Sequence, residues 1–307
     1  MLTGPVVGYT MRTWKDPVAS GPMRAIIFFP PFRPLVQEST KLGPWWVEAN
    51  GAGAIGPSLH PMVFISHGRA GSRFGHHDLA VALARAGYVV CAIEHPGDNY
   101  ADQTRVATED VWVGRARQIS AAIDALVAEP FFAGHLDTTR IGVAGFSEGG
   151  YTSLLLGGAK PDFSRWKGYC GRHPEDPALC KRPPPDLGVP RGKSIRDERV
   201  RAAFVMAPLG IFFDPAQSFT AVRVPVALTV AEKDSVLFPE ENAAPVKAGL
   251  SSMVEYTEIP AADHYVFLAP CSGSPTICAD PLGVNRPSVH AAVNTAAVKF
   301  FDRELKR

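Results

Sequence analysis

The chain has 307 residues, a formal net charge of +1 at pH 7 and a hydrophobic content of 46%. A net charge this close to zero provides no electrostatic attraction for nucleic acid or for an anionic membrane. No apolar run approaches the ~18 residues that a membrane-spanning helix needs, and no internal repeat recurs at a fixed period. The length allows one large α/β domain or two small ones.

Apolar runs and helical stripes alternate along the chain. Strands are expected near 24–29, 62–66, 88–93, 139–144, 202–207, 224–230 and 253–258. Helices are expected near 74–86, 111–128, 148–157, 240–250 and 287–303. Strands that alternate with helices predict an α/β fold, in which a mostly parallel sheet carries helices on both faces.

Two irregular segments interrupt this alternation. Residues 31–60 are rich in proline and glycine and contain Trp45 and Trp46, and residues 160–199 contain many prolines and charges. Connections of this length in a compact domain are usually functional lids or disordered segments. Because 160–199 lacks the apolar periodicity of an independent core, we interpret it as a lid-like insert in a single domain spanning 1–307.

The five cysteines divide into two local pairs and one isolated residue. Cys170 and Cys180 flank one short loop, Cys271 and Cys278 flank another, and Cys91 lies inside an apolar strand as a buried thiol. We predict two disulfides, which favour an exported protein, periplasmic or secreted. Free thiols and a four-thiolate zinc site are the alternatives, although the spacings of ten and seven residues are wide for zinc.

The N-terminus bears on the same question of compartment. Residues 1–5 lack the charged and apolar segments of a signal peptide. We therefore expect either a mature form with an added methionine or a cytoplasmic protein.

The run Gly145-Phe146-Ser147-Glu148-Gly149-Gly150 carries the main chemical signal. It follows an apolar run at 141–144 and precedes a helix-compatible run at 151–156. A serine with glycines two before and two after it, between a strand and a helix, is typical of a nucleophile elbow. The turn is strained, and the backbones pass so close that side chains at the two glycines would clash. The pattern predicts that Ser147 is a nucleophile, the alternative being an ordinary glycine-rich turn with a solvated serine.

A nucleophilic serine needs a base further along the chain, and three histidines follow Ser147. His264 follows the strand-like run 254–258, on a loop from which a base can reach the elbow. We predict that His264 is the general base, the alternative being a structural loop histidine. His173, in a proline-rich loop, and His290, at the start of an amphipathic helix, are interpreted as surface residues.

The orienting acid is expected at the end of an apolar strand between serine and histidine. The run 225–230 is such a strand, and it leads into Ala231-Glu232-Lys233-Asp234. Functional groups of open α/β sheets lie at the carboxyl ends of the strands, so we predict that Asp234 orients His264. Glu232 is the competing candidate, Asp263 is too close in sequence to His264, and Asp234 could instead be a turn-forming aspartate.

A glycine-containing loop, 67–72, follows the apolar run 61–66. Its backbone can turn N–H groups toward a bound carbonyl, and we predict the amides of Arg69 and Glu148 as oxyanion donors. His67 is interpreted as a structural residue under this loop rather than as a base. The guanidinium groups of Arg69 and Arg73 are expected to be solvated or paired with acids such as Asp98. For Arg69, contact with an anionic part of the substrate is the alternative.

In chain order, the loop 67–72, the elbow at Ser147, the acid Asp234 and the base His264 resemble the α/β-hydrolase family. The runs 64–68, 80–88 and 89–98 look like its platelet-activating-factor acetylhydrolase and dienelactone-hydrolase-like branch, as do Val7-Gly8-Tyr9 and the strand 24–30. The resemblance covers roughly residues 5–305. It implies the α/β-hydrolase fold, with a triad and an oxyanion hole at the following positions: Ser147, Asp234, His264, Arg69 and Glu148.

The chain departs from that branch at two positions. Ser147 stands where true dienelactone hydrolases have a cysteine, which favours an ester substrate over dienelactone. Glu148 stands where the acetylhydrolases carry an aromatic residue. A carboxylate is favourable at a helix N-terminus but would repel an oxyanion, so we expect the Glu148 side chain to face away from the site.

Together these features predict a serine carboxylic-ester hydrolase that forms an acyl-enzyme and needs no metal or organic cofactor. The expected partner is a small-molecule or lipid-like ester. The alternatives are a peptidase or amidase of the same fold and a non-catalytic binding protein on the same scaffold, which would need a broken triad.

Overall fold

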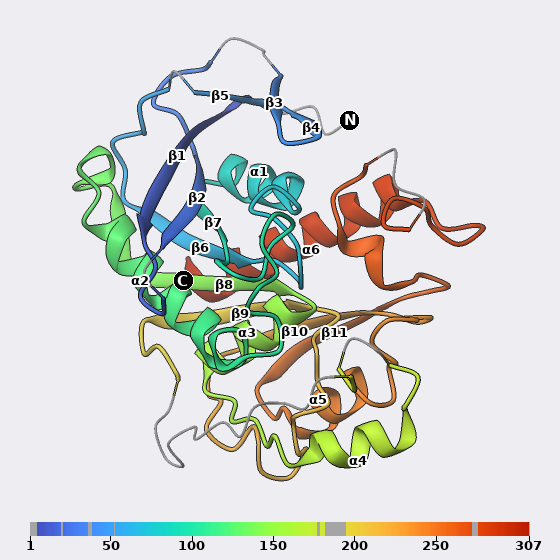
Figure 1. Cartoon of the computed structure of the whole chain (residues 1–307). Helices are drawn as coiled ribbons and strands as arrows, with labels where there is room; N and C mark the ends of the chain where they lie inside the picture. Colours follow the sequence, from blue (N-terminus) through green and yellow to red (C-terminus); the bar gives the residue numbers. More distant parts are fainter. Residues whose placement is uncertain are drawn as a thin grey trace.

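The sequence alternation produces one nine-stranded sheet and a separate two-stranded hairpin in the described part of the chain (Figure 1). The computed structural model describes residues 5–19, 21–35, 39–51, 53–176, 179–181, 195–271 and 276–306. The hairpin consists of β3 (Thr40–Leu42) and β4 (Trp45–Val47). The strands of the large sheet are β1 (Val7–Lys15), β2 (Pro22–Phe29), β5 (Ala49–Asn50), β6 (His60–Ser66), β7 (Val89–Glu94), β8 (Leu136–Phe146), β9 (Val200–Met206), β10 (Val226–Ala231) and β11 (Met253–Ile259).

Most of the sheet is parallel, as predicted. The spatial order is β11-β10-β9-β8-β6-β7-β2-β1-β5, and neighbours from β11 to β7 run parallel. Strands β1 and β2 pair antiparallel, and so do β2 and β7. Along the chain, β7 is added on one side of β6 and β8 on the other. Such a reversal opens a crevice at the carboxyl ends of the strands.

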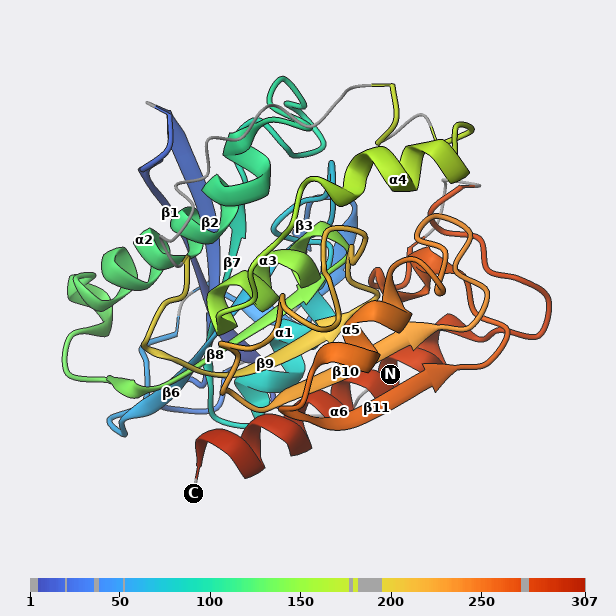
Figure 2. The same ribbon diagram turned by 90° about the horizontal axis from the view of Figure 1, so that it is seen from below.

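Helices cover both faces of this sheet (Figure 2). On one face, α1 (His77–Arg85) packs against α6 (Arg286–Leu305). On the other face lie α2 (Arg115–Val127), α3 (Glu148–Gly157) and α5 (Ala243–Gly249), with a π-helical turn, Asp110–Gly114, leading into α2. None of the described helices is both long enough and apolar enough to span a membrane.

Alternating side chains explain why the strands read as unbroken apolar runs. Ile27 and Phe29 of β2 lie in the core beneath α2 and α3, whereas Ile26 and Phe28 lie in the core beneath α1 and α6. All four are fully buried. A strand covered on both faces needs apolar residues at every position, which distinguishes it from a half-exposed strand.

The seven predicted strands and five predicted helices are confirmed, and the structure adds elements that the sequence did not indicate. One is α4 (Arg165–Arg172), inside the predicted 160–199 insert. Of its side chains only Tyr169 is fully buried, and Trp166 and Cys170 pack, partly buried, against the same core. Tyr169 donates a hydrogen bond to Asp176 at 2.8 Å, which ties the helix to the following turn. Residues 177–178 and 182–194 of the predicted insert lie outside the described residues.

The structure contains both expected disulfides, Cys170–Cys180 and Cys271–Cys278. Cys91 is a free, fully buried thiol on β7, and burial raises its pKa. It is therefore an inert, apolar side chain in the core.

We expect the native protein without reductant to have no thiol that reacts with an alkylating agent, because Cys91 is buried. Denaturation should expose one thiol, and peptide mapping under non-reducing conditions should recover both local pairs. Each disulfide closes a short loop and should contribute about 2–3 kcal/mol to stability. Five alkylatable thiols in the denatured protein without reductant would rule out both disulfides.

Candidate active site

Ser147 occupies a strained turn between β8 and α3. Its φ of 58° and ψ of −121° lie outside the regions that non-glycine residues usually adopt. A Cβ atom at Gly145 would collide with the backbone of Gly149, and one at Gly149 would collide with the carbonyl of Ser66. Glycine at these two positions therefore lets α3 begin directly against the end of β6.

A chain of hydrogen bonds runs from Ser147 to His264 and Asp234. The Nε2 atom of His264 lies 3.1 Å from Ser147 Oγ, and its Nδ1 lies 2.7 Å from Asp234 Oδ2. The Asp234 carboxylate also accepts the backbone N–H groups of Val236 and Leu237, at 3.0 and 2.6 Å. A carboxylate only accepts, so Nδ1 carries the ring proton and Nε2 is available to accept the serine proton. All three side chains are buried.

The competing acids have other partners. The carboxylate of Glu232 accepts the backbone N–H of Ala261 at 2.7 Å. Asp263 accepts the N–H groups of Ser235 and of His264, both at 2.7 Å, so it joins the two loops that carry the acid and the base. The structure thus brings Asp234, and not Glu232, to the imidazole of His264.

Ser147 opens onto a cavity of about 360 Å³. Arg69 and Glu148, the predicted oxyanion donors, line this cavity together with Ser147 and His264. The N–H of Glu148 belongs to the first turn of α3, where helical amides have no partner within the helix. Asp176 and Leu179 also line the cavity, so the described part of the 160–199 insert borders the site.

A second, apolar cavity of about 410 Å³ adjoins the first. The two share Arg69, Ala70, Phe146 and Tyr265. Its remaining walls include several large apolar side chains: Trp45, Phe74, Tyr100, Leu268 and Ile277.

No family model matches the chain, and no curated protein matches it. Among solved structures it is similar to a ferulic acid esterase from Streptomyces cinnamoneus, with a TM-score of 0.70 and 19% identity over 100% of this chain and 91% of that chain. The chain has the α/β-hydrolase fold. It is also similar to a putative dipeptidyl aminopeptidase IV from Bacteroides ovatus ATCC 8483, with a TM-score of 0.56 and 11% identity over 97% of this chain and 36% of that chain. The acetylhydrolase and dienelactone hydrolase branch stays a prediction.

Within this α/β-hydrolase fold, His67 supports the loop that follows β6. Its Nδ1–H donates to the carbonyl of Gly68 at 2.6 Å, and its Nε2 accepts the N–H of His95 at 3.1 Å. Burial, together with the nearby charge of Arg115, lowers the pKa of His67 to about 3. The ring is therefore a neutral structural group, as the sequence indicated.

The sequence did not identify Arg115 as a residue of this region, and it offered Asp98 only as a partner for Arg69 or Arg73. Arg73 pairs with Glu94 at 2.7 Å and not with Asp98. Asp98 pairs instead with Arg115, at 3.0 Å, and Arg115 also donates to Glu148 at 3.1 Å. The side chain of Glu148 is thus held by Arg115, as expected for a group turned away from an oxyanion. The sequence offered no signal for these contacts, because Glu148 lies 33 positions from Arg115 along the chain.

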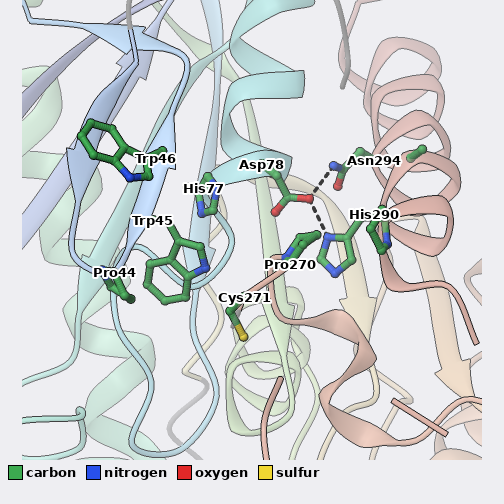
Figure 3. A pocket seen from close by; sticks show the side chains of 11 residues that line it. Pro44, Trp45, Trp46, His77, Asp78, Pro270, Cys271, His290 and Asn294 are labelled. Carbon is green, nitrogen blue, oxygen red and sulfur yellow. Dashed lines mark hydrogen bonds and ion pairs between the residues drawn. The ribbon is translucent and has the colours of Figure 1, made fainter. Parts of the chain in front are cut away.

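The prediction that His290 lies at the surface is wrong. His290 is buried in α6, where one ring nitrogen lies 2.5 Å from Asp78 Oδ2 (Figure 3). The other ring nitrogen lies 2.8 Å from the carbonyl of Val266. The Asp78 carboxylate also accepts from Asn294 at 2.8 Å. Both nitrogens face acceptors, so the ring is positioned as an imidazolium. The sequence could not reveal this, because the face of α6 that meets α1 depends on long-range packing. His173 is also partly buried, against Phe238.

The Asp78–His290 pair lies at one side of a hollow of about 650 Å³, and neither Ser147 nor His264 is among the residues that line this hollow. Figure 3 shows Trp45 and Trp46 of β4 on one side and Cys271 and Pro270 at its edge. Trp45 and Cys271 also line the apolar cavity described above, so the hollow and that cavity have walls in common. Among the described residues, no group of three or more His, Cys, Asp or Glu side chains is arranged to hold a metal ion.

The Asp78–His290 pair should make stability dependent on pH. Burial disfavours the charged ring, but the Asp78 carboxylate outweighs it and raises the pKa of His290. Because the pKa of His290 is higher in the folded than in the unfolded state, protonation of this ring stabilises the fold. The stabilisation is complete below the unfolded-state pKa of about 6.5, and it disappears as the pH rises through the folded-state pKa. We expect His290→Gln to lower the free energy of unfolding at pH 6 by about 3 kcal/mol, and by less at high pH.

Urea unfolding of the wild type and of the variant across this pH range measures the effect. A cost that stays constant with pH would mean that His290 is held by packing alone and not by charge.

Proposed function

We propose that this protein is a serine hydrolase that cleaves carboxylic esters through an acyl-enzyme. The observation that carries the proposal is the buried chain of hydrogen bonds from Asp234 through His264 to Ser147, which ends at a cavity. The strained φ of Ser147 supports it, because backbone strain of this kind is typical of nucleophile elbows.

In the proposed mechanism, His264 Nε2 accepts the proton of Ser147 Oγ as the oxygen attacks the carbonyl carbon of the ester. The charge of the tetrahedral oxyanion is held by the backbone N–H groups of Arg69 and Glu148. Asp234 keeps the proton on Nδ1 and stabilises the imidazolium that forms. His264 then protonates the leaving alcohol, and a water molecule repeats the sequence to release the acid.

An apolar or aromatic group next to the ester carbonyl fits the site best. The apolar cavity that adjoins the Ser147 cavity is walled by aromatic and aliphatic side chains, among them Phe74, Phe146 and Leu268. Pockets of this kind bind ligands mainly by burying apolar surface. The similarity to a ferulic acid esterase supports an ester of an aromatic acid as the substrate. The apolar side chains of the cavity would also accommodate a lipid-like ester.

Two rival functions remain testable on the same site. A peptidase or amidase would use the same three side chains, and the similarity to a putative dipeptidyl aminopeptidase IV is the observation in its favour. This chain spans only about a third of that protein, so we favour the ester. A non-catalytic binding protein would carry the fold without covalent reactivity at Ser147.

We also propose that residues 1–307 act as one domain in an oxidising compartment, periplasmic or extracellular. The two disulfides support this location, since such bonds are rare in reducing cytoplasm.

Ser147→Ala should lower kcat on p-nitrophenyl acetate by roughly 10³-fold or more, the loss expected when the nucleophile of such a triad is removed. The parent protein should be labelled at Ser147 by a fluorophosphonate, and an anilide analogue should be turned over far more slowly than the ester. Ser164→Ala, an exposed serine of the insert, is the control and should behave as the parent. Turnover by Ser147→Ala near that of the parent would remove Ser147 from the mechanism.

Asp234→Asn should cost far more activity than Glu232→Gln. An amide at position 234 can donate to the imidazole and so favours the wrong tautomer of His264, which in a comparable triad lowers kcat by roughly 10⁴-fold. Glu232 accepts the Ala261 N–H and pairs with Lys233, and neither contact involves His264, so its change should leave kcat within about threefold. Steady-state kinetics of both variants on one ester measures the two losses in kcat. A larger loss for Glu232→Gln than for Asp234→Asn would contradict the assignment of Asp234 as the acid.

A further inference from the structure

A buried arginine joins two carboxyl groups beneath the proposed oxyanion hole. Arg115 Nη1 donates to Asp98 Oδ2 at 3.0 Å and to Glu148 Oε2 at 3.1 Å. Its Nη2 donates to the backbone carbonyl of His67 and, at 3.4 Å, to Ser66 Oγ. Arg115, Asp98 and Glu148 are 1%, 0% and 5% exposed, so these contacts are removed from water.

These contacts reach both segments that carry the proposed oxyanion amides. The first segment is the loop after β6, where Arg115 holds the carbonyl of His67. Asp98 Oδ1 accepts the N–H of Ala70 at 3.0 Å, and Ala70 has a φ of 51°, a conformation that needs outside support. The second segment is the start of α3, where Arg115 holds the side chain of Glu148.

The charges of Arg115, Asp98 and Glu148 are also compatible with a position beside an oxyanion. Burial and the Asp98 charge raise the pKa of Glu148 well above its usual value, although Arg115 opposes them. Burial would raise the pKa of Asp98 too, but Arg115 and a hydrogen bond from Glu148 outweigh it and the pKa is lowered. These directions favour the negative charge on Asp98 and the proton on Glu148. Arg69 and Tyr151 also face Glu148, and neither adds a negative charge at neutral pH.

We propose that Arg115 is a positioning residue for hydrolysis, which holds the amides of Arg69 and Glu148 at the spacing that an oxyanion requires. This inference rests on the proposed function. One guanidinium fork holds Asp98, the His67 carbonyl and Glu148, which come from two loops and one helix, a geometry that an ammonium group cannot reproduce. Asp98 balances the arginine charge, so the network adds no net negative charge beside the developing oxyanion.

The size of the expected effect follows from oxyanion chemistry. Losing one donor of an oxyanion hole costs roughly 10²–10³-fold in kcat, and a displacement of about 1 Å can cost about 10²-fold. A loosened network should therefore act on kcat, because the amides bind the transition state more strongly than the neutral ester.

Arg115→Lys tests the proposal and should lower kcat on p-nitrophenyl acetate by about 10- to 100-fold, with KM changed by less than about threefold. Arg199→Lys is the matched control. Arg199 also makes a fork of hydrogen bonds, to Asp197 and to Asp124 and the Ser120 carbonyl of α2, but it lies apart from the Ser147 cavity. Its change should leave kcat within about twofold of the parent.

Two measurements separate positioning from loss of fold. Titration with a fluorophosphonate counts the reactive Ser147 groups, so kcat is expressed per functional site. A trifluoromethyl ketone then probes the amides directly: Ser147 Oγ adds to its carbonyl, the serine proton moves to His264, and the former carbonyl oxygen takes the negative charge. Its inhibition constant should rise by the same factor by which kcat/KM falls, as for a transition-state analogue.

A second pair of variants tests the network if Arg115→Lys does not fold. Glu148→Ala keeps the backbone amide and a good helix residue but removes the group held by Arg115. Glu148→Gln restores an uncharged group that can accept from Arg115 and donate to Asp98. We expect Glu148→Ala to lower kcat at least tenfold more than Glu148→Gln does.

Equal kcat for Arg115→Lys and the parent, expressed per titrated site, would overturn the proposal, as would equal losses for the two Glu148 variants. Failure of the proposed function has a different signature. In that case the parent protein itself would show no turnover and no fluorophosphonate labelling that depends on Ser147.

Discussion

Backbone crowding at the carboxyl ends of β6 and β8 is the constraint on which the rest of the site depends. The two strands pair in parallel, with Ser66 opposite Gly145. Gly149 then brings the first turn of α3 against the Ser66 carbonyl, a distance that no side chain would permit. Because the chain must reverse here without a side chain on either flank, Ser147 is forced into a strained conformation beside the loop after β6.

Two buried polar networks meet at this crowded turn. On one side, Asp234 and His264 reach Ser147 from the loops after β10 and β11. On the other, Arg115 and Asp98 hold the loop after β6 and the start of α3. Taking charges out of water is costly unless they are paired and hydrogen-bonded, and each network contains an anion that is satisfied in this way.

Local patterns were sufficient to predict the elements that frame the site. The elbow is specified within six residues, because glycine spacing and strand–helix context are both short-range. His264 and Asp234 could be proposed because parallel strands all deliver their carboxyl ends to one edge of the sheet, so a polar residue just after a strand is a candidate. The buried strands were also recognisable, since residues such as Phe28 and Phe29 are apolar on both faces.

The same approach failed where a side chain's partner comes from a distant part of the chain. Arg115 and Glu148 are 33 positions apart, and His290 and Asp78 are 212 apart. The sequence placed His290 at the surface and gave Arg115 no role, because nothing local distinguishes a charged residue that is buried with a partner from one that is exposed. Helix α4 was missed because its apolar face is short, and contacts beyond the helix help to hold it, among them the Cys170–Cys180 disulfide and the Tyr169–Asp176 hydrogen bond.

The sequence by itself thus determined the order of strands and helices, the elbow around Ser147 and the short set of residues that could serve it. Tertiary structure alone decided which acid meets His264, which histidines are buried, and that Arg115 connects Asp98 with Glu148. The physical reason is the range of the forces involved. Backbone sterics and apolar periodicity act between near neighbours in the chain, whereas the pairing of buried charges depends on how whole elements pack.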